Sequence, residues 1–144
     1  MTAAFEGRLT GTHHIRLPVS DVQTAREFWE GVLGYEWEFD FPGDSGPVAS
    51  AFRHLSGGPN VVLWLDPERA REFAGFVMCG IGVEDASAID RLKAALDARG
   101  IPHGGVQGAF VEVKLPFVRT PGGPMVSFYV KPDPDVQVVR PTIA

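Results

Sequence analysis

The sequence predicts an α+β fold made of two tandem β-α-β-β-β modules within a single domain. The main observation is an internal repeat, which is the signature of a duplicated structural unit. Turn and helix-end residues recur after 64 to 66 positions: Gly57 and Gly122, Asp21 and Asp85, Gly34 and Gly100. The order of strand and helix patterns also repeats between these landmarks. The modules are expected over about 11–66 and 75–131, and residues 132–144, with three prolines, are expected to form an extended C-terminal tail.

The first module opens with a strand and an amphipathic helix. Residues 13–19 alternate and are typical of a strand. Ser20 followed by Gln23 fits a capping box, which predicts that the helix begins there. Apolar residues then recur at helical spacing, and Gly34 is predicted to end the helix.

Three further strands are predicted in the first module, over residues 36–41, 48–55 and 60–65. In the first of these strands aromatic and acidic residues alternate strictly, and successive side chains of a strand point to opposite faces. This pattern predicts three aromatic rings on one face: Trp37, Phe39 and Phe41. The other face is predicted to present three carboxylates to water: Glu36, Glu38 and Asp40.

A short connecting helix is predicted to begin at Asp66, because a capping aspartate is followed there by Pro67. The second module is then predicted to repeat the order of strands and helix of the first. Residues 76–83 are typical of a strand, and Asp85 is expected to cap a helix that ends at Gly100. Its remaining strands are expected near residues 108–114, 116–119 and 124–130.

Composition and charge exclude several classes of function. The net charge is −5 and no run of Lys or Arg occurs, so neither nucleic acid nor a membrane surface is expected as a partner. No stretch approaches the roughly 18 apolar residues of a transmembrane helix. The one cysteine, Cys79, excludes an intrachain disulfide, and the first residues do not resemble a signal peptide. A cytoplasmic location is therefore expected.

Several segments resemble one protein family. They are HHIRLPVSDVQTAREFWEGVLGY from His13, DARGI from Asp97 and TPGGPMVSFYV from Thr120. These segments are similar to the first strand and helix, the end of the second helix, and the final hairpin of the vicinal oxygen chelate superfamily. That superfamily contains glyoxalases, bleomycin resistance proteins and extradiol dioxygenases, and the likeness covers roughly residues 11–130. It implies mixed sheets that curl into an open cup for ligands and metals, and a homodimer.

The resemblance also implies a metal site with one ligand from each of four strands. Matching the family's spacing onto both modules assigns these positions to His14, Val62, Met78 and Ser127. Only His14 is an ordinary ligand for a divalent ion that prefers imidazole and carboxylate groups. We therefore expect no metal and no other cofactor. The alternative is a divalent metal held by a shifted set of ligands around His14, with His54 and Glu112 as further candidates.

Strand alternation predicts which side chains line the cup. The predicted ligand-binding residues are Arg16, Trp64, Met78, Gly80, Ser127 and Tyr129, with Trp37 and Phe39 extending the aromatic wall. An apolar and aromatic lining with a few polar points is typical of a small-molecule pocket. Gly80 either leaves the floor of the cup open or permits a close approach between strands. Cys79 is expected on the opposite face, as apolar filling of the core.

Two of the polar residues carry the chemical predictions. A guanidinium in an apolar cup is costly unless it is paired, so Arg16 needs a carboxylate of this protein or an anionic group on a ligand. His14 is either a strand histidine without a chemical role or a general base. In the second case Ser127 or Tyr129 would donate a hydrogen bond to the substrate.

The sequence therefore predicts a protein that binds an organic small molecule in a metal-free cup. Its role would be to sequester a drug or toxin, or to catalyse a metal-free reaction, and the sequence leaves open whether it is an enzyme. The alternative is a divalent-metal-dependent lyase, isomerase or dioxygenase built around His14. A third interpretation is a structural or regulatory partner with a vestigial cup.

Overall fold

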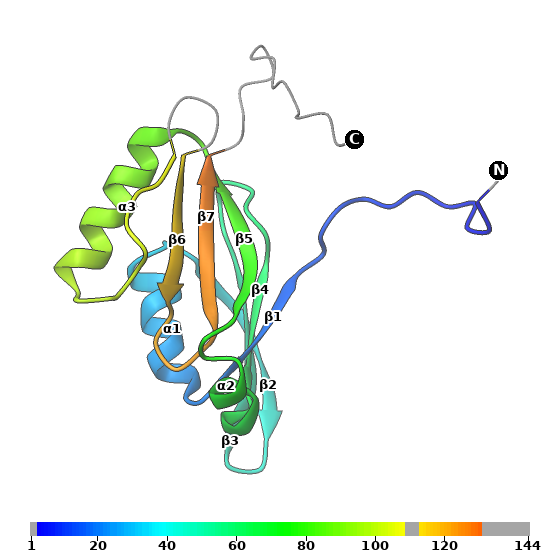
Figure 1. The fold of residues 1–144 in the computed structure, drawn as a ribbon. Helices are drawn as coiled ribbons and strands as arrows, with labels where there is room; N and C mark the ends of the chain where they lie inside the picture. Colours follow the sequence, from blue (N-terminus) through cyan, green and yellow to red (C-terminus); the bar gives the residue numbers. More distant parts are fainter. Residues whose placement is uncertain (1–2, 109–112, 131–144) are drawn as a thin grey trace.

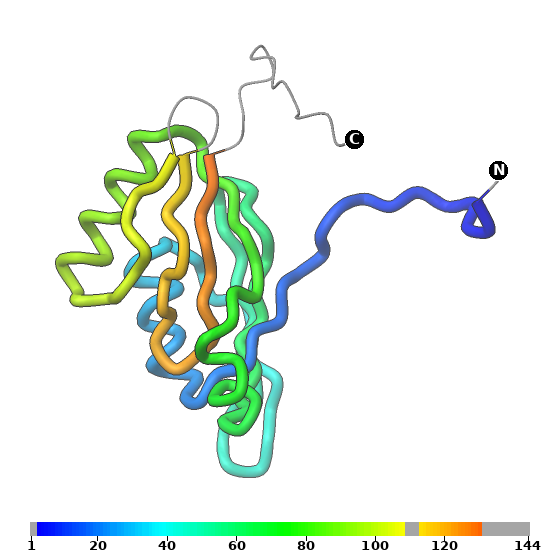
Figure 2. Tube along the Cα trace, in the orientation of Figure 1, coloured from blue at the N-terminus to red at the C-terminus, as the bar shows by residue number. Residues whose placement is uncertain are grey.

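The computed structural model describes residues 3–108 and 113–130, which fold in the order β1-α1-β2-β3-β4-α2-β5-α3-β6-β7 (Figure 1). The strands are β1 (Ile15–Val19), β2 (Glu36–Gly43), β3 (Gly46–Arg53), β4 (Val61–Leu65), β5 (Val77–Val83), β6 (Lys114–Arg119) and β7 (Met125–Val130). The helices are α1 (Val22–Gly31), α2 (Pro67–Glu72) and α3 (Ala86–Ala98). Figure 2 shows the segment before β1 leaving the sheets as an extended chain. Across the described ranges, no helix is long and apolar enough to cross a membrane.

The strands form two mixed sheets that repeat one pattern. The first sheet has the order β1-β4-β3-β2, and the second has the order β5-β7-β6. In each sheet the first strand of the module runs parallel to its last strand, and the other pairs are antiparallel. This shared order confirms the predicted duplication. The strand predicted over 108–114 lies partly outside the described residues; within them, Gln107 and Lys114 form an isolated antiparallel bridge.

Each helix in the described ranges begins with an aspartate cap. The carboxylates of Asp66 and Asp85 accept hydrogen bonds from backbone amides of the first helical turn, as predicted. At α1 the cap is Asp21, which accepts from the Thr24 amide at 2.8 Å. The predicted capping box that begins at Ser20 is therefore wrong by one residue, because Asp21 has the extended backbone of a cap and the carboxylate that reaches the free amide.

Helices α1 and α3 cover one face of the sheets and share a single cluster of buried side chains with them. Helix α1 packs on β3 and β4, and α3 packs on β6 and β7. We call this cluster the main core; its largest fully buried members are Trp29, Phe52, Leu17, Leu63, Ile89, Leu96 and Leu115. Burying such a side chain contributes roughly 1.5–3 kcal/mol. Because both modules contribute to the main core, it holds them together.

The opposite face of the first sheet points away from the main core. Residue pairing across the strands shows which side chains share this face: Arg16, Phe39, Phe41, Ala49, Ala51, Val62 and Trp64. We call this surface the open face. It corresponds to the inside of the cup that the family resemblance implies.

Candidate functional site

A row of stacked side chains crosses the open face. The guanidinium carbon of Arg16 lies 4.2 Å from the centre of the Trp64 ring, which is a cation–π contact. The ring centres of Trp64 and Phe41 are 6.1 Å apart, and those of Phe41 and Phe39 are 5.2 Å apart. We call these four residues the aromatic row. Phe39 is 48% exposed and Phe41 is 37% exposed, so the row has a large apolar surface available for contact.

Strand register explains why the aromatic row forms. Phe39 and Phe41 pair with small residues of β3, namely Ala51 and Ala49. Ala49 also pairs with Trp64 of β4, which brings rings from two strands together around it. The alanines are buried and leave room for their large cross-strand neighbours. Phe39 and Trp64 therefore share the face on which alternation predicts them, and their role in ligand binding stays a prediction.

Trp37 lies on the other face, so the predicted aromatic wall that includes it is wrong. A β-bulge at Glu38 places one extra residue in β2, and Trp37 pairs with the core residue Phe52. Because one inserted residue reverses the alternation, Trp37 and Phe39 point to opposite sides of the sheet. On the helix side, the guanidinium of Arg26 lies 5.3 Å from the centre of the Trp37 ring.

Asp40 stabilises this bulge from the helix side. Its carboxylate accepts hydrogen bonds from the hydroxyl of buried Ser50 at 2.5 Å and from the indole N–H of Trp37 at 2.8 Å. These two bonds, that of Ser50 first, hold the pKa of Asp40 below its ordinary value. Asp40 therefore keeps its predicted face, opposite Phe39 and Phe41, and is exposed there, while the bulge brings Trp37 to the same side.

Gly80 and Tyr129 pack against each other on the second sheet. In the parallel β5–β7 ladder, Gly80 lies beside Ser127, and Gly82 lies beside Tyr129. A Cβ atom on Gly80 would lie 2.9 Å from the Tyr129 ring, so glycine permits a close approach here. Gly80 is nevertheless exposed, so the close approach of the Tyr129 ring and an open floor coexist at this position. A Cβ atom on Gly82 would meet no described atom within 4 Å.

The side chain of Ser127 is buried. It is 1% exposed, and its hydroxyl oxygen accepts a hydrogen bond from the Phe117 amide at 3.1 Å. Strand β6 shifts register between Leu115 and Val118, and Phe117 has a φ of 57°, in the left-handed region. The hydroxyl of Ser127 thus satisfies an amide at this irregularity. Its predicted position in the lining of the cup is therefore wrong.

Met78 also departs from the predicted cup lining. The β5–β7 ladder shifts register between Val77 and Cys79, so simple alternation fails at this position. Met78 is half-buried and packs against the main core, as does Cys79. Burial raises the pKa of the Cys79 thiol to about 11, which suits its predicted role as apolar filling.

His14 lies just before β1, and its side chain is exposed. Its Nδ1 lies 2.9 Å from Nδ1 of His13, and the two rings meet edge to face. The alternation that would direct His14 into the cup applies only from Ile15 onward, where the strand begins. Its predicted use as a general base stays a prediction.

The four positions that the resemblance assigns to metal ligands do not suit a divalent ion. Val62 is a buried apolar residue with no donor atom in its side chain. Met78 packs against the main core, and the Ser127 oxygen already accepts a bond from a backbone amide. His14 alone offers an imidazole, and hard or borderline divalent ions require several imidazole or carboxylate ligands.

The shifted ligand set around His14 gains no support from His54. The Nε2–H of His54 donates to the Leu33 carbonyl at 2.7 Å, and its Nδ1 accepts from the Ser56 hydroxyl at 2.6 Å. Both ring nitrogens are therefore engaged within the protein. Glu112 lies outside the described residues, and among the described ones no group of three His, Cys, Asp or Glu side chains is arranged to hold a metal ion.

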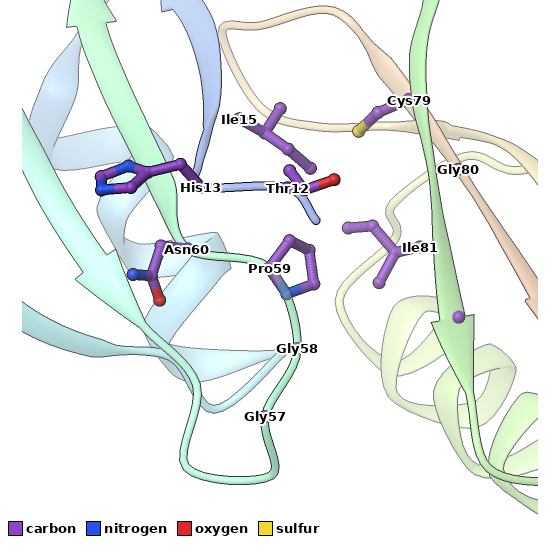
Figure 3. A pocket seen from close by; sticks show the side chains of 11 residues that line it. Thr12, His13, Ile15, Gly57, Gly58, Pro59, Asn60, Cys79, Gly80 and Ile81 are labelled. Carbon is purple, nitrogen blue, oxygen red and sulfur yellow. The ribbon is translucent and has the colours of Figure 1, made fainter. Parts of the chain in front are cut away.

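A separate pocket of about 560 Å³ lies at the seam between the modules (Figure 3). Thr12 and His13 line it from the chain before β1, Asn60 from the chain before β4, and Cys79 and Gly80 from β5. Of the predicted binding residues, only Gly80 belongs to it. The loop residues of this pocket carry no periodic signal, and they meet β5 only because the two modules pack together. The sequence feature that points to this pocket is the turn at Gly57, which the internal repeat pairs with the turn at Gly122.

Comparison with known proteins identifies the family. The sequence profile of the Glyoxalase/Bleomycin resistance protein/Dioxygenase superfamily matches residues 11–136. No match to a curated protein sequence was found. The profile match spans most of the chain and includes both modules.

Solved structures share the fold at low sequence identity. TnmS3, an antibiotic binding protein from Streptomyces sp. CB03234, matches with a TM-score of 0.66 and 18% identity, over 89% of this chain and 100% of that chain. A lactoylglutathione lyase from Agrobacterium tumefaciens has a TM-score of 0.65 and 16% identity, over 86% and 96% of the respective chains. A glyoxylase/bleomycin resistance protein/dioxygenase domain from Frankia sp. EAN1pec has a TM-score of 0.69 and 18% identity, over 88% and 96%. With the duplicated modules and the profile match, these likenesses of fold lead to one conclusion: the chain belongs to the Glyoxalase/Bleomycin resistance protein/Dioxygenase superfamily.

Proposed function

We propose that the protein binds an organic molecule with an aromatic body and an acidic group, held on the aromatic row without a metal ion. This proposal rests on the contacts of the Arg16 side chain. Its guanidinium stacks on Trp64, and none of the ion pairs among the described residues involves it. Arg16 is exposed, so water solvates its guanidinium, and among the described residues no carboxylate pairs with it. Its N–H donors are therefore available to an anionic group on a ligand.

Stacking on Trp64 leaves the edge of the Arg16 guanidinium available. A cation–π contact uses the face of this planar group, whereas its N–H donors point outward in the plane. A carboxylate can accept two of these hydrogen bonds side by side, and such charge-assisted bonds are roughly twice as strong as neutral ones. Trp64 therefore orients Arg16 for recognition of an acid.

The remainder of the aromatic row suits an apolar ring system. Phe39 and Phe41 continue from Trp64 across the open face and keep large exposed areas. Covering apolar surface contributes roughly 25 cal/mol per Å² of area removed from water. Contiguous exposed apolar patches of this kind mark binding surfaces more often than surface hydrophobics scattered singly. A ligand whose rings cover the phenylalanines would bring its acidic group to Arg16.

The family supports binding of an organic molecule. TnmS3, which has the same fold, is an antibiotic binding protein. The metal-free part of the proposal rests on Val62, Met78 and Ser127, which offer neither imidazole nor carboxylate at the implied ligand positions. By the same resemblance, we propose a homodimer that sequesters its ligand. The single cysteine, Cys79, supports our proposal of a cytoplasmic location.

Replacement of Arg16 tests the proposal directly. A thermal-shift screen of planar aromatic carboxylates, each with its neutral amide, identifies a ligand, and quenching of tryptophan fluorescence measures its affinity. Arg16→Ala is expected to weaken binding of the acid by about tenfold or more, because a hydrogen bond to a charged group is worth roughly 1.5–3 kcal/mol. The matched control is Arg71→Ala on α2, an exposed arginine outside the aromatic row that joins no ion pair among the described residues. Equal affinity of the wild type and Arg16→Ala for the acid would overturn the proposal.

A further inference from the structure

The two modules close one end of the seam between them. There the turn between β6 and β7 contacts the residue that follows β1. The Ser20 amide donates a hydrogen bond to the Gly122 carbonyl at 2.8 Å. The contact is tight, because a Cβ atom on Gly122 would lie 2.8 Å from the Ser20 hydroxyl. A Cβ atom on the next residue, Gly123, would lie 3.5 Å from the carbonyl oxygen of Pro18.

The other end of the seam is open. The internal repeat assigns Gly57 to the position of Gly122, and Glu84 to that of Ser20. Within the described residues no hydrogen bond joins the Glu84 amide to the Gly57 carbonyl, and a Cβ atom on Gly57 would meet nothing within 4 Å. A cleft of about 970 Å³ lies here, between β5, α3 and the turn that joins β3 to β4. We call this turn the first hairpin, and we call the cleft the seam cleft.

Two aromatic side chains fasten the first hairpin to its own module. The Tyr35 hydroxyl donates to the Pro59 carbonyl at 2.9 Å, and the Tyr35 ring meets the His54 ring edge to face at 4.9 Å. In the second module the corresponding carbonyl, that of Pro124, accepts from the small side chain of Thr120 at 2.6 Å. The larger pair forms part of the wall of the seam cleft and keeps the hairpin on the side of the first module.

The walls of the seam cleft are mainly apolar. Side chains from both modules supply them: Val32, Leu33, Leu92, Ala95 and Phe128. The two charged residues of the wall pair with each other, Arg91 with Glu84 at 3.1 Å. The imidazole of His54 uses both of its nitrogens within the protein. An ionic ligand would therefore lose hydration without gaining a free partner among these groups, which favours a neutral ligand.

The geometry points to the seam cleft as a second binding site, separate from the aromatic row, that takes a neutral and mainly apolar organic molecule. Its volume is at the upper end of the range of about 300–1,000 Å³ that small-molecule sites occupy. The seam cleft is on the helix side of the sheets, whereas the aromatic row is on the open face. Because both modules line it, its occupant stabilises one arrangement of the modules.

A neutral fluorescent dye, N-phenyl-1-naphthylamine, tests this inference, because its emission rises in apolar surroundings. The wild type is expected to bind the dye. Ala95→Trp fills the seam cleft from α3 and is expected to weaken the binding by about tenfold or more, and the smaller Ala95→Leu is expected to weaken it less. The matched control is Ala94→Trp, at the neighbouring exposed residue of α3, which is expected to change the affinity less than about twofold.

Amide chemical shifts of isotope-labelled wild type provide a readout that needs no variant. Dye is expected to shift the amides of Val83, Leu92 and Ala95, which line the seam cleft but not the pocket of about 560 Å³. Absence of dye binding, unchanged affinity in both Ala95 variants, or shifts confined to the open face would each overturn the inference. Phe39→Ala separates this result from the proposed function, because Phe39 supplies exposed ring surface to the aromatic row. Its dye affinity is expected to equal that of the wild type, and a loss there would place the dye on the aromatic row instead.

Discussion

The hydroxyl of Ser127 and the guanidinium of Arg16 differ in what their neighbours leave available. Ser127 is buried and already accepts the Phe117 amide, so its oxygen belongs to the fold. Arg16 is exposed and stacked on Trp64, and in the described part of the chain it joins no ion pair. At the scale of single residues, the existing partners of a polar group therefore distinguish a structural role from a binding role.

Gly80 and Gly82 form a matched pair for a test of packing. Gly80→Ala is expected to lower the free energy of unfolding by about 1–2 kcal/mol relative to Gly82→Ala, because the new Cβ atom would crowd the Tyr129 ring. At Gly82 the methyl group has space, and reduced freedom of the unfolded chain contributes roughly 0.4–1 kcal/mol of stability. Urea unfolding of both variants measures the difference. Equal stabilities would show that the Tyr129 ring moves aside without cost.

Ser127→Ala is expected to lower the free energy of unfolding by about 1–3 kcal/mol, because it leaves the Phe117 amide without its partner. Hydrogen exchange of the Phe117 amide is expected to become faster in the same variant. The control is Ser45→Ala, at an exposed serine of the turn between β2 and β3. Unchanged stability and exchange in Ser127→Ala would contradict the structural role of this hydroxyl.

Irregularities within strands decide the direction of side chains at the scale of elements. Alternation with a period of two holds only while the ladder is regular, and one inserted residue reverses it. The bulge at Glu38 turns Trp37 to the helix side, although Phe39 keeps its predicted face. A register shift at Met78 has a related effect in β5. Both irregularities interrupt sequence patterns that look regular.

The bonds of Asp40 at the β2 bulge make stability depend on pH. The pKa of Asp40 is lowered in the folded state, so the stabilisation is complete above the unfolded value of about 3.9. It is lost as the pH falls through the lower folded value. Urea unfolding from neutral pH to about pH 3 is expected to show a shallower loss of stability in Asp40→Asn than in the wild type.

The comparison for Asp40→Asn is Asp44→Asn, which removes an exposed carboxylate from the adjoining turn. Other carboxylates with lowered pKa values, those of Asp85 and Asp97, remain in both variants, so only the difference between the two profiles reports on Asp40. Identical profiles would show that the bonds from Ser50 and Trp37 do not favour the ionised form.

At the scale of the whole molecule, two similar modules are joined by one core but meet unequally along their seam. The main core contains side chains of both modules, and the strand order of the first sheet recurs in the second. One end of the seam is closed by the bond between Ser20 and Gly122, and the other end contains the seam cleft. The open face and the seam cleft are therefore two separate surfaces of one domain.

The stability of the whole molecule is expected not to depend on a metal ion. A bound ion that favours the folded state would raise the Tm, so treatment with a chelator is expected to leave both the Tm and the ligand affinity unchanged. Elemental analysis of the untreated protein checks the metal content. Stoichiometric Fe, Mn, Ni or Zn that is lost in His14→Ala would contradict this expectation and would favour a metal-dependent enzyme.

Local signals predicted much of the architecture. Asp66 and Asp85 cap their helices as expected, and Gly34 and Gly100 have the left-handed φ values of 76° and 65° that suit the ends of helices. The candidate site was less predictable. Arg16, Trp64 and Phe39 lie together on the open face, whereas Met78 packs against the main core and Gly80 lines the pocket at the seam.

By itself, the sequence determined the duplicated module, the helix ends and the alternation of the regular strands. These features depend on residues a few positions apart, or on a repeat that is visible along the chain. Only the tertiary structure decided that Trp37 faces the helices, that Ser127 is sealed beneath β6, and that the seam is open at one end. Bulges, buried hydrogen bonds and the packing of modules depend on contacts between residues far apart in the chain, and no local pattern specifies those contacts.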